Sequence, residues 1–349
     1  MKENYAKIAL WQTAFLGDAV LTLPFIKALS SSFPGAEVHL FVRKGVEPLF
    51  QAQRELAGVH AFDKRGAQKG MKAAFEFGSA LGRQGFDLWI SAHTSMRSAV
   101  VGMASGISRR IGYDSPWYNR FVYTDTVCRK FDELDEVERL MALGDPLGIS
   151  GPAPVAGLDL PESAVEDARN FFSSLDGRPV LGVHPGSTWE TKKWPEHNFS
   201  RIIERAVDGG YTVILFGGPA EVELAERVAR QSGRQDAVIN LAGSLDLPQL
   251  AAYIRMLDLY LTNDSGPMHI AWVQDVPVLA MFGPTVRQFG FFPRGENSTV
   301  LEAPGELKCR PCGLHGGRSC PEKHHRCMTD ITVDMVWNEI LSKTGSRGL

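Results

Sequence analysis

An aspartate in a short loop is the residue best placed to act as a general base. Asp18 closes the loop at residues 13–18, which follows a short apolar segment and contains a turn-permitting glycine, Gly17. An aspartate where a helix begins can equally serve to cap free N–H groups. A helix N-terminus also stabilises a carboxylate and so weakens it as a base. Both roles stay open, and a group transfer in which the acceptor proton leaves late would tolerate a weak base.

A second loop carries two lysines close to small and hydroxyl-bearing residues. Residues 184–195 read His-Pro-Gly-Ser-Thr-Trp-Glu-Thr-Lys-Lys-Trp-Pro and follow an apolar segment. Ser187 and Thr188 offer hydroxyl and backbone donors, and Lys192 and Lys193 supply positive charge. A diphosphate needs several donors and compensating charge. The loop is therefore a candidate diphosphate site, with a solvated surface loop as the alternative.

A third loop combines a helix start with polar side chains. Residues 262–269 read Thr-Asn-Asp-Ser-Gly-Pro-Met-His. The N–H groups of Ser265 and Gly266 would face an anion at the helix N-terminus. Asp264 repels phosphate, so we expect it to bind sugar hydroxyls or to fix the loop. His269 is either a donor to the phosphate or a core histidine.

Two further turns resemble each other, and each follows a predicted strand. In the turn at residues 282–285, Gly283 lets the backbone approach a ligand closely and Thr285 adds a hydroxyl. The turn at residues 216–219 contains Gly217 and precedes Glu221, a candidate to hold a ribose hydroxyl pair. A glutamate there can also simply favour the first turn of a helix.

Four of the five cysteines lie close together near the C-terminus, at Cys309, Cys312, Cys320 and Cys327. Converging thiolates are typical of zinc or iron–sulfur sites. The Cys-x-x-Cys pair fits such a site, whereas the other spacings match no standard zinc module. A structural metal, reduced thiols and a disulfide formed on oxidation all remain open.

The elements that must position these loops alternate as strand, loop and helix, and the pattern restarts near residue 178. Such alternation predicts two Rossmann-like, doubly wound α/β domains, facing across a cleft in which the loops at the strand carboxyl ends bind ligands. We expect an N-terminal acceptor-binding domain at residues 1–165 and a nucleotide-sugar domain at 166–330. Residues 331–349 would form a helix that packs back on the first domain.

Composition narrows the class of protein. The chain has 349 residues, of which 44% are hydrophobic and 22% charged, and its net charge is −3. This composition is typical of a globular protein and lacks the overall basic field of a nucleic-acid binder. No secretory signal or membrane-spanning stretch is evident. We expect a cytoplasmic protein whose only membrane contact is peripheral, at the inner membrane.

Taken together and in order, these motifs resemble those of glycosyltransferase family 9, the ADP-heptose:lipopolysaccharide heptosyltransferases, over nearly the whole chain. The resemblance rests on residues 16–18 and 21–24, the Lys-Lys-Trp-Pro run at 192–195, the loop at 262–269 and the Gly-Pro-Thr turn at 283–285. The cysteine segment is similar to that of heptosyltransferase II-type members.

The resemblance implies a GT-B fold and an inverting transfer without a catalytic metal. It implies that Asp18 is the base, that Lys192 neutralises the donor diphosphate, and that Asp264, Ser265, Gly266 and His269 bind the donor. The implied partners are ADP-heptose and a lipid A–core acceptor at the inner leaflet. We expect acceptor contacts from Thr13, Gly17 and Arg97, and from a patch that includes Arg109, Arg110, Trp117 and Tyr118.

Other readings of the same loops are another nucleotide-sugar transferase of this family, a non-hydrolysing nucleotide-sugar epimerase, and a metal-binding scaffold organised by the cysteines. A dinucleotide-dependent oxidoreductase fits poorly, because no Gly-x-Gly-x-x-Gly follows the first strand.

Overall fold

The computed structural model describes residues 4–345 and divides the chain into two compact units, one ending at Leu160 and one beginning at Pro161. The break falls slightly before the predicted boundary, just ahead of α7 (Glu162–Ser173). Among residues 4–345, no helix is both long and apolar enough to cross a bilayer.

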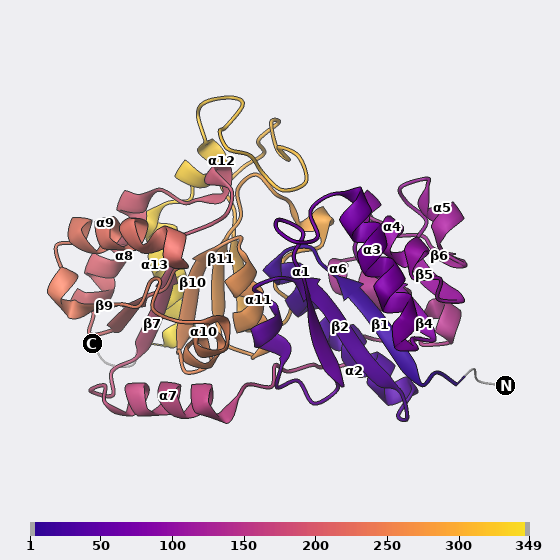
Figure 1. Ribbon diagram of the computed structural model, residues 1–349. Coiled ribbons are helices and arrows are strands. Elements are labelled where there is room, and N and C mark those ends of the chain that lie inside the picture. Colours follow the sequence, from indigo (N-terminus) through magenta and orange to yellow (C-terminus); the bar gives the residue numbers. More distant parts are fainter. Residues whose placement is uncertain (1–3, 346–349) are drawn as a thin grey trace. The chain divides into compact units, whose positions relative to one another are not determined.

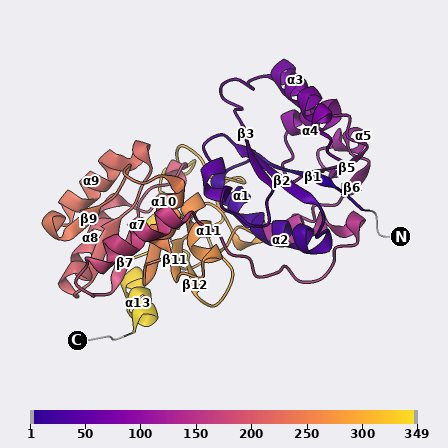
Figure 2. The ribbon, with the colours of Figure 1, turned by 60° about the horizontal axis from the view of Figure 1, so that its bottom comes forward.

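The first unit is a doubly wound α/β domain. Its six-stranded parallel sheet has the order β3-β2-β1-β4-β5-β6. The strands are β1 (Lys7–Gln12), β2 (Glu37–Arg43), β3 (Gly58–Phe62), β4 (Leu88–Ser91), β5 (Arg109–Tyr113) and β6 (Asp125–Val127). The helices are α1 (Leu16–Leu21), α2 (Leu23–Ser32), α3 (Met71–Leu81), α4 (Met96–Ala104), α5 (Asn119–Val122) and α6 (Glu136–Ala142). Helices α3, α4 and α5 lie side by side over one face of the sheet, and α2 covers the other (Figure 1 and Figure 2).

Helices on both faces explain why the central strands are apolar along their length rather than alternating. In β1, Ile8 to Trp11 are fully buried. Trp11 packs against Trp89 of β4 and Phe41 of β2, with ring centroids 5.1 and 5.8 Å apart. This aromatic core fixes β1 at the centre of the sheet, and the loop that carries Asp18 leaves from its end.

The second unit repeats this architecture, with strand order β12-β11-β10-β7-β8-β9 in a six-stranded parallel sheet. The strands are β7 (Val180–His184), β8 (Thr212–Leu215), β9 (Val238–Asn240), β10 (Leu259–Asn263), β11 (Val278–Met281) and β12 (Ser298–Leu301). Besides α7, the helices are α8 (Glu196–Asp208), α9 (Val222–Gln231), α10 (Leu247–Ile254), α11 (Gly266–Val273), α12 (Arg326–Thr329) and α13 (Val333–Thr344). Two doubly wound domains are thus confirmed.

Helix α13 differs from its prediction. It packs against α8, β10 and β11, with Trp337 edge-on to Tyr211 and Arg205 paired with Asp334 at 2.7 Å. Its apolar stripe, Val336 and Ile340, joins the core of the second unit. The terminal helix therefore completes the core of the second unit, in contrast to the prediction that it packs back on the first.

Candidate active site

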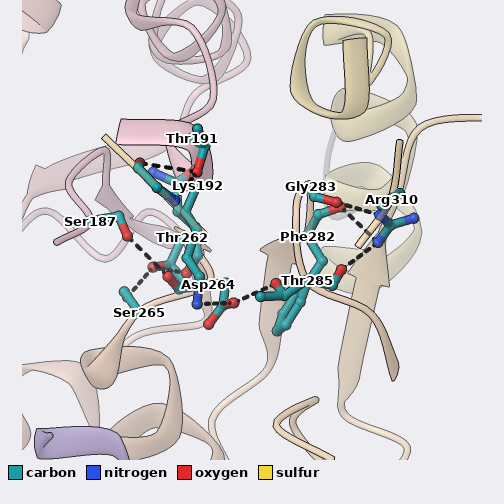
Figure 3. A network of polar contacts seen from close by, with 12 residues as sticks. Ser187, Thr191, Lys192, Thr262, Asp264, Ser265, Phe282, Gly283, Thr285 and Arg310 are labelled. Atoms are coloured by element: carbon teal, nitrogen blue, oxygen red, sulfur yellow. Dashed lines mark hydrogen bonds and ion pairs between the residues drawn. The ribbon is translucent and has the colours of Figure 1, made fainter. Parts of the chain in front are cut away.

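The predicted donor loops of the second unit gather at one edge of its sheet. Strand β10 lies between β7 and β11, with Thr262 opposite His184 and Asn263 opposite Met281. Because all three strands are parallel, the loops that follow them emerge side by side. Figure 3 shows the polar network that these loops form.

The centre of this network is an ion pair between two of the predicted loops. The Lys192 Nζ atom lies 2.5 Å from Asp264 Oδ2, and the two side chains are only 12% and 9% exposed. The Thr285 hydroxyl donates to the same Asp264 oxygen at 2.7 Å. Lys193 differs from its neighbour, because it pairs with the more exposed Glu190. Of the two lysines, Lys192 is therefore the one within the network.

The start of α11 lies beside this ion pair. Gly266 is the first residue of the helix, and the Ser265 side chain does not cap it, because its hydroxyl contacts that of Thr262 at 3.1 Å. Ser187, from the loop after β7, donates to the Asp264 carbonyl at 3.2 Å. First-turn N–H groups and a lysine ammonium thus share one small region, which is the requirement for binding a diphosphate.

Asn263 ties the two central loops together. Its side chain accepts from the Trp194 N–H at 3.0 Å and donates to the Pro185 carbonyl at 2.8 Å. It is fully buried, so these bonds lock the lysine-bearing loop to the end of β10. The Lys192 side chain is thereby aimed from a fixed backbone.

His269 sits in α11, buried beneath the ion pair. Burial is the main reason that its pKa falls to about 4, and the charge of Lys192 lowers it further. Its ring is therefore neutral near pH 7, with Nδ1 buried and unbonded among the residues that the structure describes. A neutral imidazole can still donate one hydrogen bond, so both predicted roles of His269 stay open.

Glu221 lies at the same edge, beyond β7. It contacts His184 Nε2 at 3.1 Å and accepts from the Gly218 N–H at 2.8 Å. Burial opposes ionisation, but these two hydrogen bonds, together with the nearby charges of His184 and Lys193, outweigh it and lower the pKa of Glu221. Its carboxylate lies so close to Gly186 that a Cβ on that residue would overlap it. Gly217 is half-buried beside it, while Thr188 is exposed.

Asp18 occupies the corresponding edge of the first unit. Asp18 is the third residue of α1, so it lies within the helix and does not precede it. Its carboxylate extends back to the start of the helix, where it accepts from the Phe15 N–H at 3.1 Å. Burial, followed by the charge of Glu136, raises the pKa of Asp18 to about 6, despite the lowering effect of backbone hydrogen bonds and Arg129. The expectation of a weakened base is wrong, because desolvation exceeds the effect of the helix start.

Basic side chains surround Asp18. Burial and the charges of Arg43, Arg97 and Arg65 lower the pKa of Lys64 to about 8. Lys64 Nζ donates to the Thr13 carbonyl at 2.7 Å, and Arg97 donates to the Lys64 carbonyl at 3.0 Å. Cations this crowded favour an anionic ligand. We call Arg43, Lys64, Arg65 and Arg97 the basic cluster.

A neutral histidine lies within the same group. Burial, together with the charge of Lys64, lowers the pKa of His93 to about 4. Its Nδ1 lies 3.0 Å from the Thr13 hydroxyl and 3.2 Å from that of Ser98. Thr13, Gly17 and Arg97, the three predicted acceptor residues, thus all lie around the end of β1 and the start of α4.

Arg109 and Arg110 do not join this cluster. Both lie at the amino end of β5, opposite the edge that carries Asp18. Arg109 pairs with Asp125 and donates to Tyr5, and Arg110 donates to the Val122 carbonyl at 2.8 Å. The prediction that they line an acceptor patch is wrong, because their strand carries them to the other edge of the sheet.

The four C-terminal cysteines are thiols that form no disulfide, and the Cys312 thiol donates to the Cys309 carbonyl at 3.1 Å. Burial and the neighbouring cysteines Cys312, Cys320 and Cys309 raise the pKa of Cys327 to about 11. Among residues 4–345, no group of three or more His, Cys, Asp or Glu residues is arranged to hold a metal ion. A metal at Cys309, Cys312, Cys320 and Cys327 stays a prediction.

Sequence reasoning missed several residues of both sites. Lys64, His93 and Arg129 each stand two positions after a strand of the first sheet, and that position is the signal that could have found them. Arg310 gave no signal, because it lies within the cysteine segment, far along the chain from the loops it contacts.

Comparisons with known proteins agree with this architecture. The sequence model of glycosyltransferase family 9 (heptosyltransferase) matches residues 74–319. The lipooligosaccharide heptosyltransferase 2 of Haemophilus influenzae is 26% identical over 95% of this chain and 98% of its own.

Two solved structures are similar to this chain over nearly their whole length. The glycosyl transferase family 9 protein of Veillonella parvula has a TM-score of 0.87 at 22% identity, covering 99% of this chain and 98% of its own. The ADP-heptose LPS heptosyltransferase II of E. coli has a TM-score of 0.81 at 24% identity, covering 97% and 98%. They confirm the predicted GT-B fold.

Proposed function

Because the chain belongs to glycosyltransferase family 9, the heptosyltransferases, we propose that it transfers heptose from ADP-heptose to the inner core of lipopolysaccharide. The names of its relatives support this substrate pair. The observation that carries the proposal is the Lys192–Asp264 ion pair beside the start of α11.

The second unit would bind the donor. Asp264 engages one side of the Lys192 ammonium, and the ammonium has three N–H donors, so others are left for a phosphate oxygen. The first-turn N–H groups of α11 would face the same oxygens, while Ser187 holds the loop through its hydrogen bond to the Asp264 carbonyl. As the bond between the sugar and the diphosphate breaks, ADP leaves with the electron pair, and these donors stabilise its growing charge. No divalent cation is needed in that role.

The first unit would supply the base. The Asp18 carboxylate takes the proton of the acceptor hydroxyl while that oxygen bonds to the anomeric carbon, on the face opposite the departing ADP. The configuration of the sugar is thereby inverted. With a pKa of about 6, Asp18 is mostly ionised at pH 7 yet basic enough to accept the proton.

The basic cluster would select an anionic acceptor. Arg43 and Lys64 lie close enough to Asp18 to interact with its charge, and Arg97 interacts with Lys64 in turn. A phosphate or carboxylate on the acceptor sugar would relieve their mutual repulsion and orient the attacking hydroxyl. An inner-core oligosaccharide with acidic groups fits this requirement.

An apolar rim next to that cluster would meet the lipid of the acceptor. We define the rim as Met71, Phe75, Met96, Trp117 and Phe121, five large apolar side chains that are all exposed. They lie at or near the N-terminal ends of α3, α4 and α5, which adjoin the sheet edge that carries Asp18. Exposed aromatic residues are typical of surfaces that touch a membrane interface, so we propose peripheral contact with the inner leaflet.

The adjacent lysines provide the test of the donor site. We expect Lys192→Met to lower kcat/KM for ADP-heptose by ~10²–10³, as for the loss of a transition-state donor, and to weaken ADP binding measured by calorimetry. Lys193→Met is the matched control, because its ammonium pairs with Glu190 outside the network, and it should change either quantity less than about threefold.

Two outcomes would contradict the proposal. Equal effects of the two substitutions would remove Lys192 from the donor site. A wild-type protein that binds UDP or GDP more tightly than ADP would exclude ADP-heptose as the donor.

A further inference from the structure

The segment between β12 and α12 has a place in the donor site that the proposed function does not use. We call residues 302–325 the cysteine loop; it begins at the sheet edge after β12 and carries three of the four clustered cysteines. Although this strand is the outermost of its sheet, the loop reaches back and contacts two of the donor loops.

The first contact is made by Arg310. Its guanidinium donates to the carbonyls of Gly283 and Thr285, the latter at 2.6 Å, and pairs with Glu302. The Cys312 N–H donates to the Pro284 carbonyl at 3.0 Å. Figure 3 shows the Arg310 head group against the turn at residues 282–285. These bonds satisfy three successive carbonyls of the turn, so they fix its backbone.

The second contact is made through Thr191. Its N–H donates to the Gly317 carbonyl at 3.1 Å, and its hydroxyl accepts from the Gly317 N–H at 2.7 Å. His325, the last residue of the cysteine loop, contacts the Thr191 carbonyl at 2.8 Å. Thr191 is buried and immediately precedes Lys192. The loop therefore holds the backbone from which the lysine projects.

Both contacts converge on one carboxylate. Arg310 binds the turn from which the Thr285 hydroxyl donates to Asp264. The cysteine loop also binds Thr191, and the next residue, Lys192, pairs with the same Asp264 oxygen. We propose that Arg310 and Thr191 are positioning residues through which the cysteine loop sets the Lys192–Asp264 pair in the geometry that receives the donor diphosphate. This proposal rests on the proposed function for the identity of the ligand.

Loss of Arg310 or of the Thr191 hydroxyl should act through Lys192. We expect Arg310→Gln and Thr191→Val each to weaken ADP binding by about tenfold, because a misplaced donor loses most of a charge-assisted hydrogen bond. Thr191→Ser keeps the hydroxyl and should restore binding. Arg326→Gln is the control, since Arg326 pairs with Asp330, directly after α12, and within residues 4–345 makes no hydrogen bond or ion pair with the donor loops.

A double-mutant cycle separates positioning from general stability. In a Lys192→Met background, Arg310→Gln should weaken ADP binding less than about twofold further, because residues that act through one hydrogen-bond and ion-pair network are not additive. Full additivity, or a fall in melting temperature with unchanged ADP affinity, would overturn the proposal.

A second measurement needs no nucleotide. Mass spectrometry after brief acylation would follow the reactivity of Lys192 relative to Lys193 in the ligand-free protein. Lys192 should react more slowly in the wild type and gain reactivity in Thr191→Val and Arg310→Gln. If ADP fails to bind the wild type, the proposed function is wrong. If Lys192 reactivity is unchanged in both variants, Arg310 and Thr191 do not position Lys192.

Discussion

Asp18 shows how burial can prepare a carboxylate for proton transfer. One of its oxygens accepts the Phe15 N–H, which favours the ionised form, yet loss of water raises its pKa to about 6. The acid is thus poised close to neutral pH, where a general base is most effective. The same shift has a cost for the folded state, because a partly buried anion is less favourable than an exposed one.

Asp18→Asn should lower kcat by ~10²–10⁴, the usual contribution of a general base. In the wild type, kcat/KM should fall as pH drops through about 6, because the protonated acid cannot accept the acceptor proton. Steady-state values of kcat/KM measured from about pH 5 to pH 8 would show this loss of activity on the acidic side.

Folding stability provides the internal control for that variant. The folded pKa of Asp18 is raised, so the folded state binds the proton more tightly and stability falls as pH rises from the ordinary value of 3.8 to about 6. Asn removes this penalty, and Asp18→Asn should melt at a higher temperature than the wild type at pH 7. An inactive variant that melts lower would point to misfolding instead, and a fully active one would remove Asp18 from the base role. Asp132→Asn, at an exposed position, should change neither quantity.

At the scale of elements, the turn after β7 requires a glycine, because a side chain at that position would have no room. Gly186 leaves room for the Glu221 carboxylate, which bonds to His184 and to the Gly218 N–H. The glycine is needed for close approach, not for an unusual backbone angle. It allows the loops after β7 and β8 to meet over the sheet edge.

Gly186→Ala should push the Glu221 carboxylate away and break its contact with His184. Because the displaced atoms are the end of a flexible side chain, we expect a stability loss of only about 1 kcal/mol but roughly tenfold weaker ADP binding if Glu221 holds the ribose. Thermal unfolding and calorimetry would measure the two effects.

Gly218→Ala is the matched control for this substitution, since its Cβ would lie 3.7 Å from the Glu221 carboxylate, an ordinary contact. Equal ADP affinity in both alanine variants would remove Glu221 from the ribose site.

The sequence predicts the central elements better than the outer ones. The buried strands β1, β7, β10 and β11 are continuous apolar runs that the sequence alone indicates, whereas β3, β6 and β12 give no such signal. These three are outermost in their sheets, are short or only partly buried, and so have little apolar pattern. The apolar residues between Asp18 and Phe33 have the spacing of one continuous helix, but the structure breaks it at Thr22, because Pro24 in the first turn of α2 lacks an N–H.

Local patterns indicate the loops that we propose bind the donor, but they do not reveal which side chains meet. Each donor motif follows a strand, so its place at the sheet edge was predictable. Arg310 donates hydrogen bonds to the carbonyls of residues 283 and 285, and these bonds join the cysteine loop to the turn after β11. The two segments are close only because of the path that the cysteine loop takes. No spacing along the chain encodes that contact.

At the scale of the whole molecule, charge and apolar surface are unevenly distributed. The net charge is −3, so the protein as a whole is not drawn to anionic lipid. The basic cluster and the apolar rim nevertheless belong to the same unit, and the most exposed aromatics, Trp117 and Phe121, are 75% and 81% exposed. They contact each other edge-on, which presents a compact apolar surface rather than scattered side chains.

Replacing both Trp117 and Phe121 by Ser should therefore weaken binding to vesicles that contain anionic lipid by about tenfold or more, because each buried aromatic contributes about 1.5–3 kcal/mol. Vesicle co-sedimentation would measure this change. Transfer to a lipid-linked acceptor in vesicles should fall in parallel, while transfer to a delipidated, water-soluble core oligosaccharide should not, since Asp18 and Lys192 are untouched. Leu341→Ser, an exposed apolar residue on α13 of the second unit, should leave vesicle binding unchanged. Unaltered co-sedimentation of the double variant would show that the rim does not meet the membrane, and an equal loss on the soluble acceptor would assign these aromatics to the sugar instead.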